Sequence, residues 1–452
     1  MSKLVLFTNT FPFGKGETFL QEELQFTSKE FDEVVIFPLY TPNNNAYKHD
    51  IPSVGVRIMQ PLLPFDHKDK KALIKNGFFC FAPIWFAIKE FFAKRVFLSG
   101  KKMWLFANYL FVLRSILSNR SVMNEVMEQI KGCNVAYFYW GDKSALLVPF
   151  LKKRAGKGAL PKFAVRFHGS DIYEEAKGYL PFREMLYKSV DYAITISKNG
   201  EEYIKNNYKN QPKVISTHRL GSFYHSDACP NLAAPVPNNV SAADAPGAFN
   251  IVSCSNVIEL KRVHLIAQAM LMIERDNQIC SLLQDGGISH ICWTHIGDGP
   301  LLEPIKEYIT AYSVKVDEDI EATPIVYNFM GAMPHLKVID YYQTHYTDLF
   351  VQVSRSEGVP VSIMEALSFG MSVLATNVGG VAELIPQGCN CGTLLNKDLS
   401  AEDLYKSLKE WITKSIMQPG YDRALEARKL WEENWDSSKN YAKFAKFLSS
   451  LQ

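Results

Sequence analysis

The sequence predicts an α/β protein built on two parallel β-sheets, and three observations carry this prediction. First, short apolar runs rich in β-branched residues alternate with segments of helical period, the pattern of parallel sheets covered by helices. Second, these runs form two groups, separated by a stretch in which Pro230, Pro235, Pro237 and Pro246 stand among many Ala, Asn and Asp residues. Third, several runs end in glycine-containing turns that lead into a helix, where open α/β sheets bind ligands.

The two groups of runs give the expected strands. In the first half, strands are expected at residues 4–8, 34–39, 135–139, 163–167, 192–196 and 213–217. In the second half, they are expected at residues 250–254, 292–296, 325–328, 349–353 and 372–375. Two sheets of similar character are what a pair of facing Rossmann-like domains would leave in a sequence, doubly wound and with an interdomain cleft that receives the ligand.

The composition excludes several classes of function. The formal net charge is only +2, whereas a nucleic-acid-binding domain carries a clustered basic footprint, so no nucleic-acid partner is expected. The eight cysteines include no CxxC pair, and we expect reduced thiols in a cytoplasmic protein. The apolar run within residues 1–10 is too short for a signal peptide and is expected to be the first strand.

Two glutamates bracket the most informative segment, residues 354–370. Glu357 follows a buried strand, and Pro360 is suited to the first position of a helix. Glu365 then lies about one and a half turns into this helix. The free backbone N–H groups of the first turn form an anion site beside Glu357, because the amino end of a helix supplies unpaired donors and a partial positive charge. A nucleoside diphosphate fits such a site.

Together with residues 376–385 directly downstream, this segment resembles the donor-binding signature of glycosyltransferase family 4, within the glycosyl transferases group 1 and the GT-B fold. Bacterial capsular and exopolysaccharide enzymes are among the proteins it resembles. The resemblance implies a retaining hexosyltransferase that uses a UDP- or GDP-linked sugar donor and a glycan acceptor, lipid-linked in some members, without a cofactor. Glu357 would contact the donor sugar and stabilise the transition state, and Glu365 would bind the ribose diol. Donor contacts are also implied for Gly358, Val359, Pro360 and Val361.

A second marker of the family follows the strand expected at 250–254. In the family an arginine, followed five positions later by a lysine, neutralises the diphosphate of the donor and stabilises the leaving group. Lys261 matches the lysine, but Asn256 stands where the arginine is expected. Arg262 would either supply the missing charge at the diphosphate or be a solvated helix residue, and both interpretations remain open.

Two glycine turns agree with the order of motifs in the family's donor domain. Residues 294–300 form a strand that runs through Gly297 into a turn and then a helix expected at 301–309. Residues 326–331 end in a Phe-x-Gly turn at Gly331, which by the resemblance adjoins the base of the nucleotide.

The first half contains a glycine loop at residues 11–19, between the first strand and the first helix. Gly14 and Gly16 allow the backbone to approach a phosphate, and the loop resembles the family segment that closes over the donor. Glu17 and Thr18 are either plain capping residues or ligand contacts.

His168 lies in a segment, residues 166–171, that resembles the family's His-Gly-x-Asp motif, whose histidine lies beside the anomeric centre. We therefore expect His168 to contact the sugar, although a lone histidine after a strand is often structural. Residues 139–142 and 218–221 also end strands and are weaker candidates.

No metal is expected at the site. The Asp-Glu-Asp sequence at 317–319 has the residues of the metal motif of the other major glycosyltransferase fold, which lies at the end of a strand. Here these residues lie in an acidic polar stretch, where a solvated loop is expected. Cys389 and Cys391 have no second Cys or His pair at zinc spacing and are more simply an incidental loop pair.

The segment at residues 78–111 stands apart because twelve of its thirty-four residues are aromatic, against 13% of the whole chain. Phe81, Trp85, Ile88 and Phe92 recur at helical spacing, and lysines surround them. Neither uncharged run reaches the ~20 residues of a membrane span. The segment is either an interfacial hairpin on an anionic membrane surface, which would place the protein on the inner face of the cell membrane, or a helical pair packed on its own domain.

The resemblance sets the expected domains. Residues 1–225 would be the acceptor-side domain, with the aromatic and basic helical insertion at about 67–117, and 226–248 a linker. Residues 249–430 would be the donor domain, and the helices at 431–452 would cross back to the first domain. Two other functions stay open: a GT-B-shaped epimerase or phosphorylase, and a non-catalytic partner that binds a sugar nucleotide at a membrane.

Overall fold

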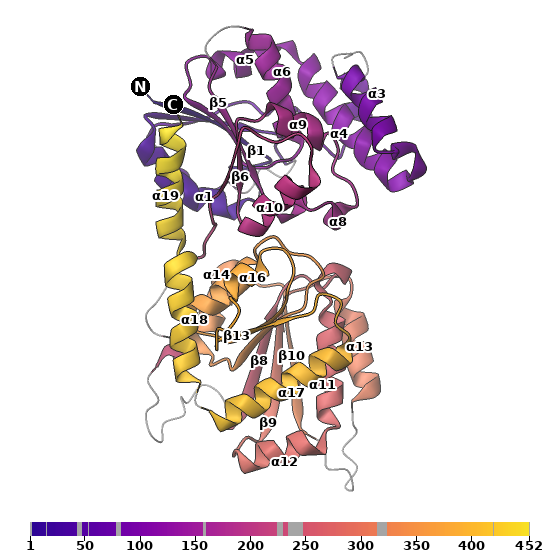
Figure 1. Cartoon of the computed structure of the whole chain (residues 1–452), viewed down its shortest axis with the longest axis vertical. Helices are drawn as coiled ribbons and strands as arrows, with labels where there is room; N and C mark the ends of the chain where they lie inside the picture. The colour runs from indigo at the N-terminus through magenta and orange to yellow at the C-terminus, as the bar shows by residue number, and fades with distance from the viewer. Residues whose placement is uncertain are drawn as a thin grey trace. The chain divides into compact units, whose positions relative to one another are not determined.

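The computed structural model describes residues 2–14, 16–42, 48–52, 54–77, 83–156, 160–223, 229–233, 247–313, 323–418 and 420–451. The chain forms two compact units, one of Met1–Leu220 with Ser438–Gln452 and the other of Gly221–Ser437 (Figure 1). Phe81, the acidic stretch at 317–319 and most of the expected linker at 226–248 lie outside the described residues.

The first unit contains a seven-stranded parallel sheet with the strand order β3-β2-β1-β4-β5-β6-β7. Its strands are β1 (Lys3–Thr8), β2 (Glu33–Pro38), β3 (Val56–Ile58), β4 (Val135–Phe138), β5 (Lys162–Phe167), β6 (Tyr192–Thr195) and β7 (Val214–Thr217). Its helices are α1 (Thr18–Glu30), α2 (Lys70–Gly77), α3 (Ile84–Ala93), η1 (Val96–Leu98), α4 (Gly100–Ser118), α5 (Arg120–Ile130), η2 (Lys143–Leu147), α6 (Val148–Ala155), α7 (Gly169–Ile172), α8 (Glu174–Lys177), α9 (Arg183–Ser189), α10 (Lys198–Asn207) and, from the end of the chain, α19 (Ser437–Ser450).

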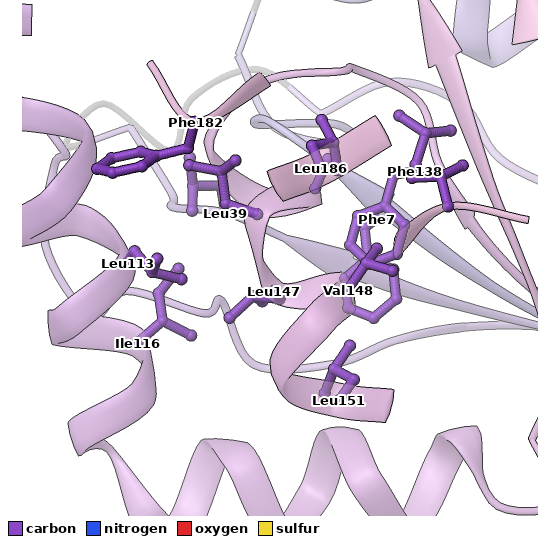
Figure 2. Close-up of a cluster of buried hydrophobic side chains, with 14 of the residues drawn as sticks. Phe7, Leu39, Leu113, Ile116, Phe138, Leu147, Val148, Leu151, Phe182 and Leu186 are labelled. Carbon is purple, nitrogen blue, oxygen red and sulfur yellow. The ribbon is translucent and has the colours of Figure 1, made fainter. Parts of the chain in front are cut away.

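Alternate residues of β1 face two different cores, as the period of a strand requires. Val5 and Phe7 pack with the helices α4, α5, α6 and α9, and Phe7 stacks on Phe138 with ring centroids 4.2 Å apart (Figure 2). Leu4 and Leu6 face the opposite core, which includes residues of α1 and α19. The sheet is therefore buried on both faces, which explains why its strands read as continuous apolar runs.

The second unit contains a six-stranded parallel sheet with the order β10-β9-β8-β11-β12-β13. Its strands are β8 (Ala248–Cys254), β9 (His290–Ile296), β10 (Ile325–Gly331), β11 (Leu349–Gln352), β12 (Val373–Thr376) and β13 (Gly392–Leu395). Its helices are η3 (Pro230–Leu232), η4 (Glu259–Lys261), α11 (Val263–Glu274), α12 (Asn277–Asp285), α13 (Leu302–Tyr312), α14 (His335–Thr344), α15 (Val361–Ser368), α16 (Val381–Leu384), α17 (Ala401–Met417) and α18 (Tyr421–Asn434).

Both sheets have a point at which the strand order reverses. In the first sheet this point lies between β1 and β4, and in the second it lies between β8 and β11. The loops that leave the carboxyl ends of these strands diverge to opposite faces, and open α/β sheets bind their ligands there. The loops after β8 and β11 contain Lys261 and Glu357, and the loops after β1 and β4 contain Gly14, Gly16 and residues 139–142.

The prediction of two parallel sheets is confirmed, and every expected strand is present to within a few residues at its ends. Two strands were missed: β3 has only three residues, and β13 follows a cysteine-containing turn without a β-branched run. Helix α15 begins at Val361 rather than Pro360, which is its N-cap. Only α19 returns to the first unit, whereas Trp431 and the rest of α18 belong to the second.

Candidate functional site

The second unit brings Lys261 and Glu357 into direct contact. The Nζ atom of Lys261 lies 2.5 Å from Oε1 of Glu357, and the side chains are 21% and 11% exposed. Lys261 is the last residue of η4, after β8, and Glu357 lies in the loop after β11, on the neighbouring strand. The expectation that both residues serve one site therefore has a geometric basis, because the two strands deliver them from opposite sides of the reversal point.

Gln352 orients the Glu357 carboxylate, and sequence reasoning missed it. Its Nε2 atom donates a 2.8 Å hydrogen bond to Oε1 of Glu357, and its Oε1 atom accepts a 2.6 Å bond from the hydroxyl of Ser362. Gln352 is the last residue of β11 and is buried. A glutamine at the end of an otherwise apolar strand could have indicated this contact, since a buried amide needs polar partners.

The amino end of α15 lies between the two glutamates of the segment. Pro360 provides no side-chain acceptor, and the first N–H groups of a helix have no intrahelical partner, so those of Val361 and Ser362 are available to an anion. At the other end, Oε1 of Glu365 lies 2.6 Å from Nε2 of His335, the first residue of α14. Glu365 is buried, whereas the side chain of His335 is more than half exposed.

A glycine turn after β12 packs against the backbone of the Glu357 loop. Gly379 has φ +55°, and a Cβ atom there would lie 1.9 Å from the carbonyl oxygen of Glu357. The next residue, Gly380, donates a 2.6 Å hydrogen bond to the carbonyl oxygen of Gly358. Val359 is buried, so the backbone from Glu357 to Pro360 is held on both sides.

Replacing Gly379 by Ala is expected to destabilise the protein by more than about 2 kcal/mol, because positive-φ strain of about 1 kcal/mol adds to a clash with backbone that cannot move freely. Gly388→Ala is the matched control, because Gly388 also has positive φ (+87°) but its Cβ would meet nothing within 4 Å. Urea unfolding of both variants measures the difference. Equal losses would show that the contact with Glu357 does not constrain the loop.

The structure does not support a phosphate contact by Arg262. Its guanidinium donates to three carbonyl oxygens, those of Val353, Ser354 and Lys397, and the residue is 5% exposed. The interpretation as a solvated helix residue is also wrong. Arg262 therefore connects the residues after β11 with the start of α11, and its guanidinium is occupied by hydrogen bonds to carbonyl oxygens. Asn256 is exposed in the loop after β8, so Lys261 is the cation that this loop directs to Glu357.

Gly297 and Gly331 shape the loops beside the Lys261 segment. Gly297 has φ +146°, and a Cβ atom there would lie 1.9 Å from the carbonyl oxygen of Ser255. Its N–H donates a 2.9 Å bond to the carbonyl oxygen of Gly331. His295 lies next to the same loop, 2.8 Å from the hydroxyl of Ser253. Burial lowers the pKa of His295 to about 4, so the ring is neutral and acts in the structure of the loop.

In the first unit, the structure contradicts the capping interpretation, one of the two left open for Glu17. Glu17 stands at the N-cap of α1 but makes no capping bond there. Its carboxylate accepts instead from the N–H groups of residues 9–11, at 3.0, 2.6 and 2.7 Å, and from Nε1 of Trp140 at 2.7 Å. Glu17 therefore closes the glycine loop that contains Gly14 and Gly16 and ties it to the loop after β4. Gly14 has φ +76°, which explains the need for glycine.

His168 lies beside this loop. Its ring lies against Trp140 with centroids 4.2 Å apart, and it is 8% exposed. Neither ring nitrogen has a hydrogen-bond partner among the described residues, although Nδ1 lies 3.8 Å from Oδ2 of Asp171. The backbone of the segment is fixed by Asp171, which accepts from the N–H groups of His168 and Gly141. A buried imidazole without a hydrogen-bond partner, held beside a glycine loop, is suited to receive a polar ligand.

The two weaker candidate segments, 139–142 and 218–221, lie in different surroundings. Trp140 contacts Glu17 and His168. The ring of His218 lies against Phe447 of α19, with centroids 4.0 Å apart. Burial, together with the charge of Arg166, lowers the pKa of His218 to about 4, so its role is packing. Among the described residues, no group of three or more His, Cys, Asp or Glu side chains could hold a metal ion, and no cysteine forms a disulfide.

A family model matches the part of the chain that contains this site. Residues 248–431 match the model of the glycosyl transferases group 1. This range contains the Lys261–Glu357 pair, the α15 amino end and Glu365. It covers most of the second unit and leaves the first unit, with Glu17 and His168, outside the match.

The chain also resembles individual glycosyltransferases. It is 33% identical over 110 residues to the putative teichuronic acid biosynthesis glycosyltransferase TuaC of Bacillus subtilis, a match that covers 24% of this chain and 26% of that protein. It is 25% identical over 235 residues to the putative colanic acid biosynthesis glycosyltransferase WcaL of Salmonella typhimurium, and the match covers 50% of each. The matches therefore span half or less of the length of these relatives.

The fold as a whole is also known. The crystal structure of Anabaena Alr3699/HepE in complex with UDP matches over 100% of both chains, with a TM-score of 0.61 and 14% sequence identity. At this identity the likeness concerns the fold alone, which is that of the GT-B glycosyltransferases. Residues 248–431 thus match the model of the glycosyl transferases group 1, within a chain that has the GT-B fold.

Proposed function

We propose that this protein is a retaining glycosyltransferase that moves a sugar from a nucleoside diphosphate donor to a lipid-linked glycan in the synthesis of a cell-surface polysaccharide. One observation carries the proposal: a lysine and a carboxylate in contact at the reversal point of the second sheet, beside the amino end of a helix. The similarity to enzymes named for teichuronic and colanic acid synthesis supports the polysaccharide product.

The donor diphosphate is bound by Lys261 and by the first N–H groups of α15. In the free protein Lys261 is paired with Glu357 at 2.5 Å, so the cation is already held where a phosphate would need it. As the bond from the sugar to the diphosphate breaks, negative charge grows on the leaving oxygen. A fixed ammonium and fixed N–H dipoles stabilise that charge without rearrangement.

Glu357 acts on the sugar. Its carboxylate is held by Lys261 and Gln352 and accepts hydrogen bonds from sugar hydroxyls, while its negative charge stabilises the positive charge that develops at the anomeric carbon. The acceptor oxygen attacks from the face that the diphosphate leaves, and the leaving oxygen takes the proton of the acceptor hydroxyl. The new glycosidic bond therefore retains the anomeric configuration of the donor.

Glu365 binds the ribose diol in this account. Glu365→Ala is expected to weaken the binding of the preferred nucleoside diphosphate about 10- to 100-fold, because a hydrogen bond to a charged group contributes about 1.5–3 kcal/mol. Isothermal titration calorimetry measures the change. Glu402→Ala, at an exposed position of helix α17, is the control and should leave the affinity unchanged. An unchanged affinity in Glu365→Ala would exclude the ribose contact.

The first unit supplies contacts to the sugar and the phosphates in the same proposal. The ring nitrogens of His168 are buried and have no hydrogen-bond partner among the described residues, and in this proposal His168 donates a hydrogen bond to the sugar. Gly14 and Gly16 allow the loop closed by Glu17 to approach a phosphate. These assignments rest on the resemblance of both segments to the family and on the observed cluster of Glu17, Trp140 and His168.

The stereochemical part of the proposal is tested by the sugar released when the enzyme hydrolyses its donor in the absence of acceptor. Proton NMR, recorded before mutarotation, is expected to show the anomer of the donor. The opposite anomer would contradict retention. Conversion of the donor to an isomeric sugar nucleotide, or its release as a sugar phosphate in phosphate buffer, would instead identify an epimerase or a phosphorylase.

A further inference from the structure

Helix α3 carries a buried carboxylate on its inner side and exposed aromatic rings on its outer side. Its buried side contains Glu90, which accepts hydrogen bonds from the hydroxyl of Tyr179 at 2.8 Å and from the N–H of Phe182 at 3.1 Å. Its outer side presents Trp85, which is 81% exposed, and Phe92, which is 65% exposed. Helix α3 does pack on its own domain through Ala87 and Phe91, but a helix that only covered its own core would bury Trp85 and Phe92 as well.

The neighbouring elements also expose large apolar side chains. The exposed large apolar side chains of α2, α3, η1 and α4 are Ile74, Trp85, Phe86, Ile88, Phe92, Phe97, Leu98, Met103 and Trp104. Phe92 and Phe97 lie against each other, with ring centroids 6.3 Å apart. Ile74 and Trp104 line one shallow pocket between α2 and α4, with Lys70 at its edge. We call these nine residues the apolar face.

The apolar face is anchored to the unit from beneath. Leu105, Tyr109 and Leu113 of α4 belong to the core of the first unit, where Figure 2 shows Leu113. The hydroxyl of Ser115 donates a 3.1 Å bond to the carbonyl oxygen of Leu73 of α2. The helices are therefore fixed by their inner sides, and the outward direction of Trp85 and Phe92 belongs to the folded state. Figure 1 shows α3 at the periphery of the first unit.

The stretch of chain that carries the apolar face also carries many basic residues, which we call its basic rim. The basic residues of the stretch 70–102 are Lys70, Lys71, Lys75, Lys89, Lys94, Arg95, Lys101 and Lys102, and its only acidic residue is Glu90, which is buried. The whole chain is nearly neutral at +2, so this concentration of positive charge is local. Lys70, Lys71, Lys75, Lys89, Arg95 and Lys101 are exposed.

We propose that the apolar face and its basic rim dock the protein onto an anionic phospholipid bilayer. The rings enter the headgroup region, where Trp and Phe side chains are favoured, and the lysines and arginine pair with lipid phosphates. No helix among the described residues is long and apolar enough to cross a bilayer, so the contact is peripheral. The proposal goes beyond glycosyl transfer and does not depend on it.

The charge pattern favours a membrane over a second copy of the chain. Two copies joined through this face would bring the two basic rims together, and like charges oppose such a contact. An exposed apolar surface of this extent is also unusual in a protein that works free in solution, because large patches mark interaction sites. An anionic bilayer satisfies both the apolar and the basic parts at once.

The test is flotation of the full chain with vesicles of phosphatidylcholine containing phosphatidylglycerol, compared with phosphatidylcholine alone. We expect the protein to float with the anionic vesicles and to be released as salt is raised, because the lysine contacts are screened. Trp85→Ser/Phe92→Ser and Lys71→Glu/Lys75→Glu should each lower the partition coefficient about tenfold or more. The controls are Met417→Ser and Lys406→Glu, which change an exposed apolar and an exposed basic residue of the second unit.

Three results would overturn the proposal. One is the absence of flotation with anionic vesicles at low salt. Another is an equal loss of binding in the control variants. The third is a concentration-dependent dimer in sedimentation that Trp85→Ser/Phe92→Ser abolishes, which would assign the apolar face to a second copy. Thermal unfolding at the wild-type midpoint shows that the variants are folded. Donor hydrolysis without vesicles tests the glycosyltransferase separately, so failure of either proposal is distinguishable.

Discussion

Glu357→Gln is expected to lower the kcat of donor cleavage about 10²- to 10³-fold, the loss observed when one preorganised group that stabilises charge in the transition state is removed. The amide keeps the shape of the side chain and can still bond to Gln352, but it lacks the negative charge. Because the contact with the nucleotide is made by other groups, the affinity for the nucleoside diphosphate should change little. Release of the nucleoside diphosphate from its sugar conjugate measures kcat.

The matched control is Glu402→Gln. Glu402 pairs with Lys406 across one turn of α17 at 3.0 Å, and both side chains are exposed, so the change should alter neither kcat nor stability. If Glu357→Gln kept the wild-type kcat, Glu357 would not act on the sugar. If it lost nucleotide affinity as much as kcat, its role would be to hold Lys261 for binding rather than to stabilise the transition state.

Lys261→Met should be the second largest loss, in both binding and rate. A charge-assisted hydrogen bond to a phosphate contributes about 1.5–3 kcal/mol, so the dissociation constant of the nucleoside diphosphate should rise about 10- to 100-fold. The value of kcat should fall as well, because the charge on the leaving oxygen grows during the reaction. Calorimetry gives the first quantity and the cleavage assay the second.

A double-mutant cycle separates this role from a structural one. In the free protein Lys261 pairs with Glu357, so Lys261→Met leaves the carboxylate with Gln352 and solvent. If the lysine served only to hold Glu357, Lys261→Met would lose nothing further once Glu357→Gln is present. We expect a further loss of nucleotide affinity in the double variant, because the phosphate contact is independent of the carboxylate. Lys306→Met, in an exposed pair on α13, is the control.

The sequence predicts the donor side well because its signals are local. Glu357, the helix start after it and Glu365 are close along the chain, so one strand, one turn and one helix place them. The contact between Lys261 and Glu357 spans 96 positions. It could be expected only because both residues follow strands, and the adjacency of β8 and β11 turns that expectation into a 2.5 Å contact.

What the sequence did not predict depends on packing between distant segments. Arg262 was open to two interpretations, and its buried bonds to carbonyl oxygens of the β11 end and of Lys397 match neither. Glu17 was open to capping or to ligand contact. It stands at the N-cap of α1, but its carboxylate accepts from Trp140, which lies 123 positions away. The helical spacing of the aromatic segment indicates an amphipathic helix, but only the structure shows that Glu90 lies on its buried side.

The proposed donor site of the second unit consists of Lys261, the α15 amino end and Glu365. Calorimetric titration of the purified protein with UDP, GDP and ADP, and with their common sugar conjugates, is the direct test of this site. We expect the protein to prefer nucleotides of one base. The affinity for that nucleotide should fall in Lys261→Met and in Glu365→Ala but not in Lys306→Met. Binding of no nucleotide, or binding that both site variants leave intact, would contradict it.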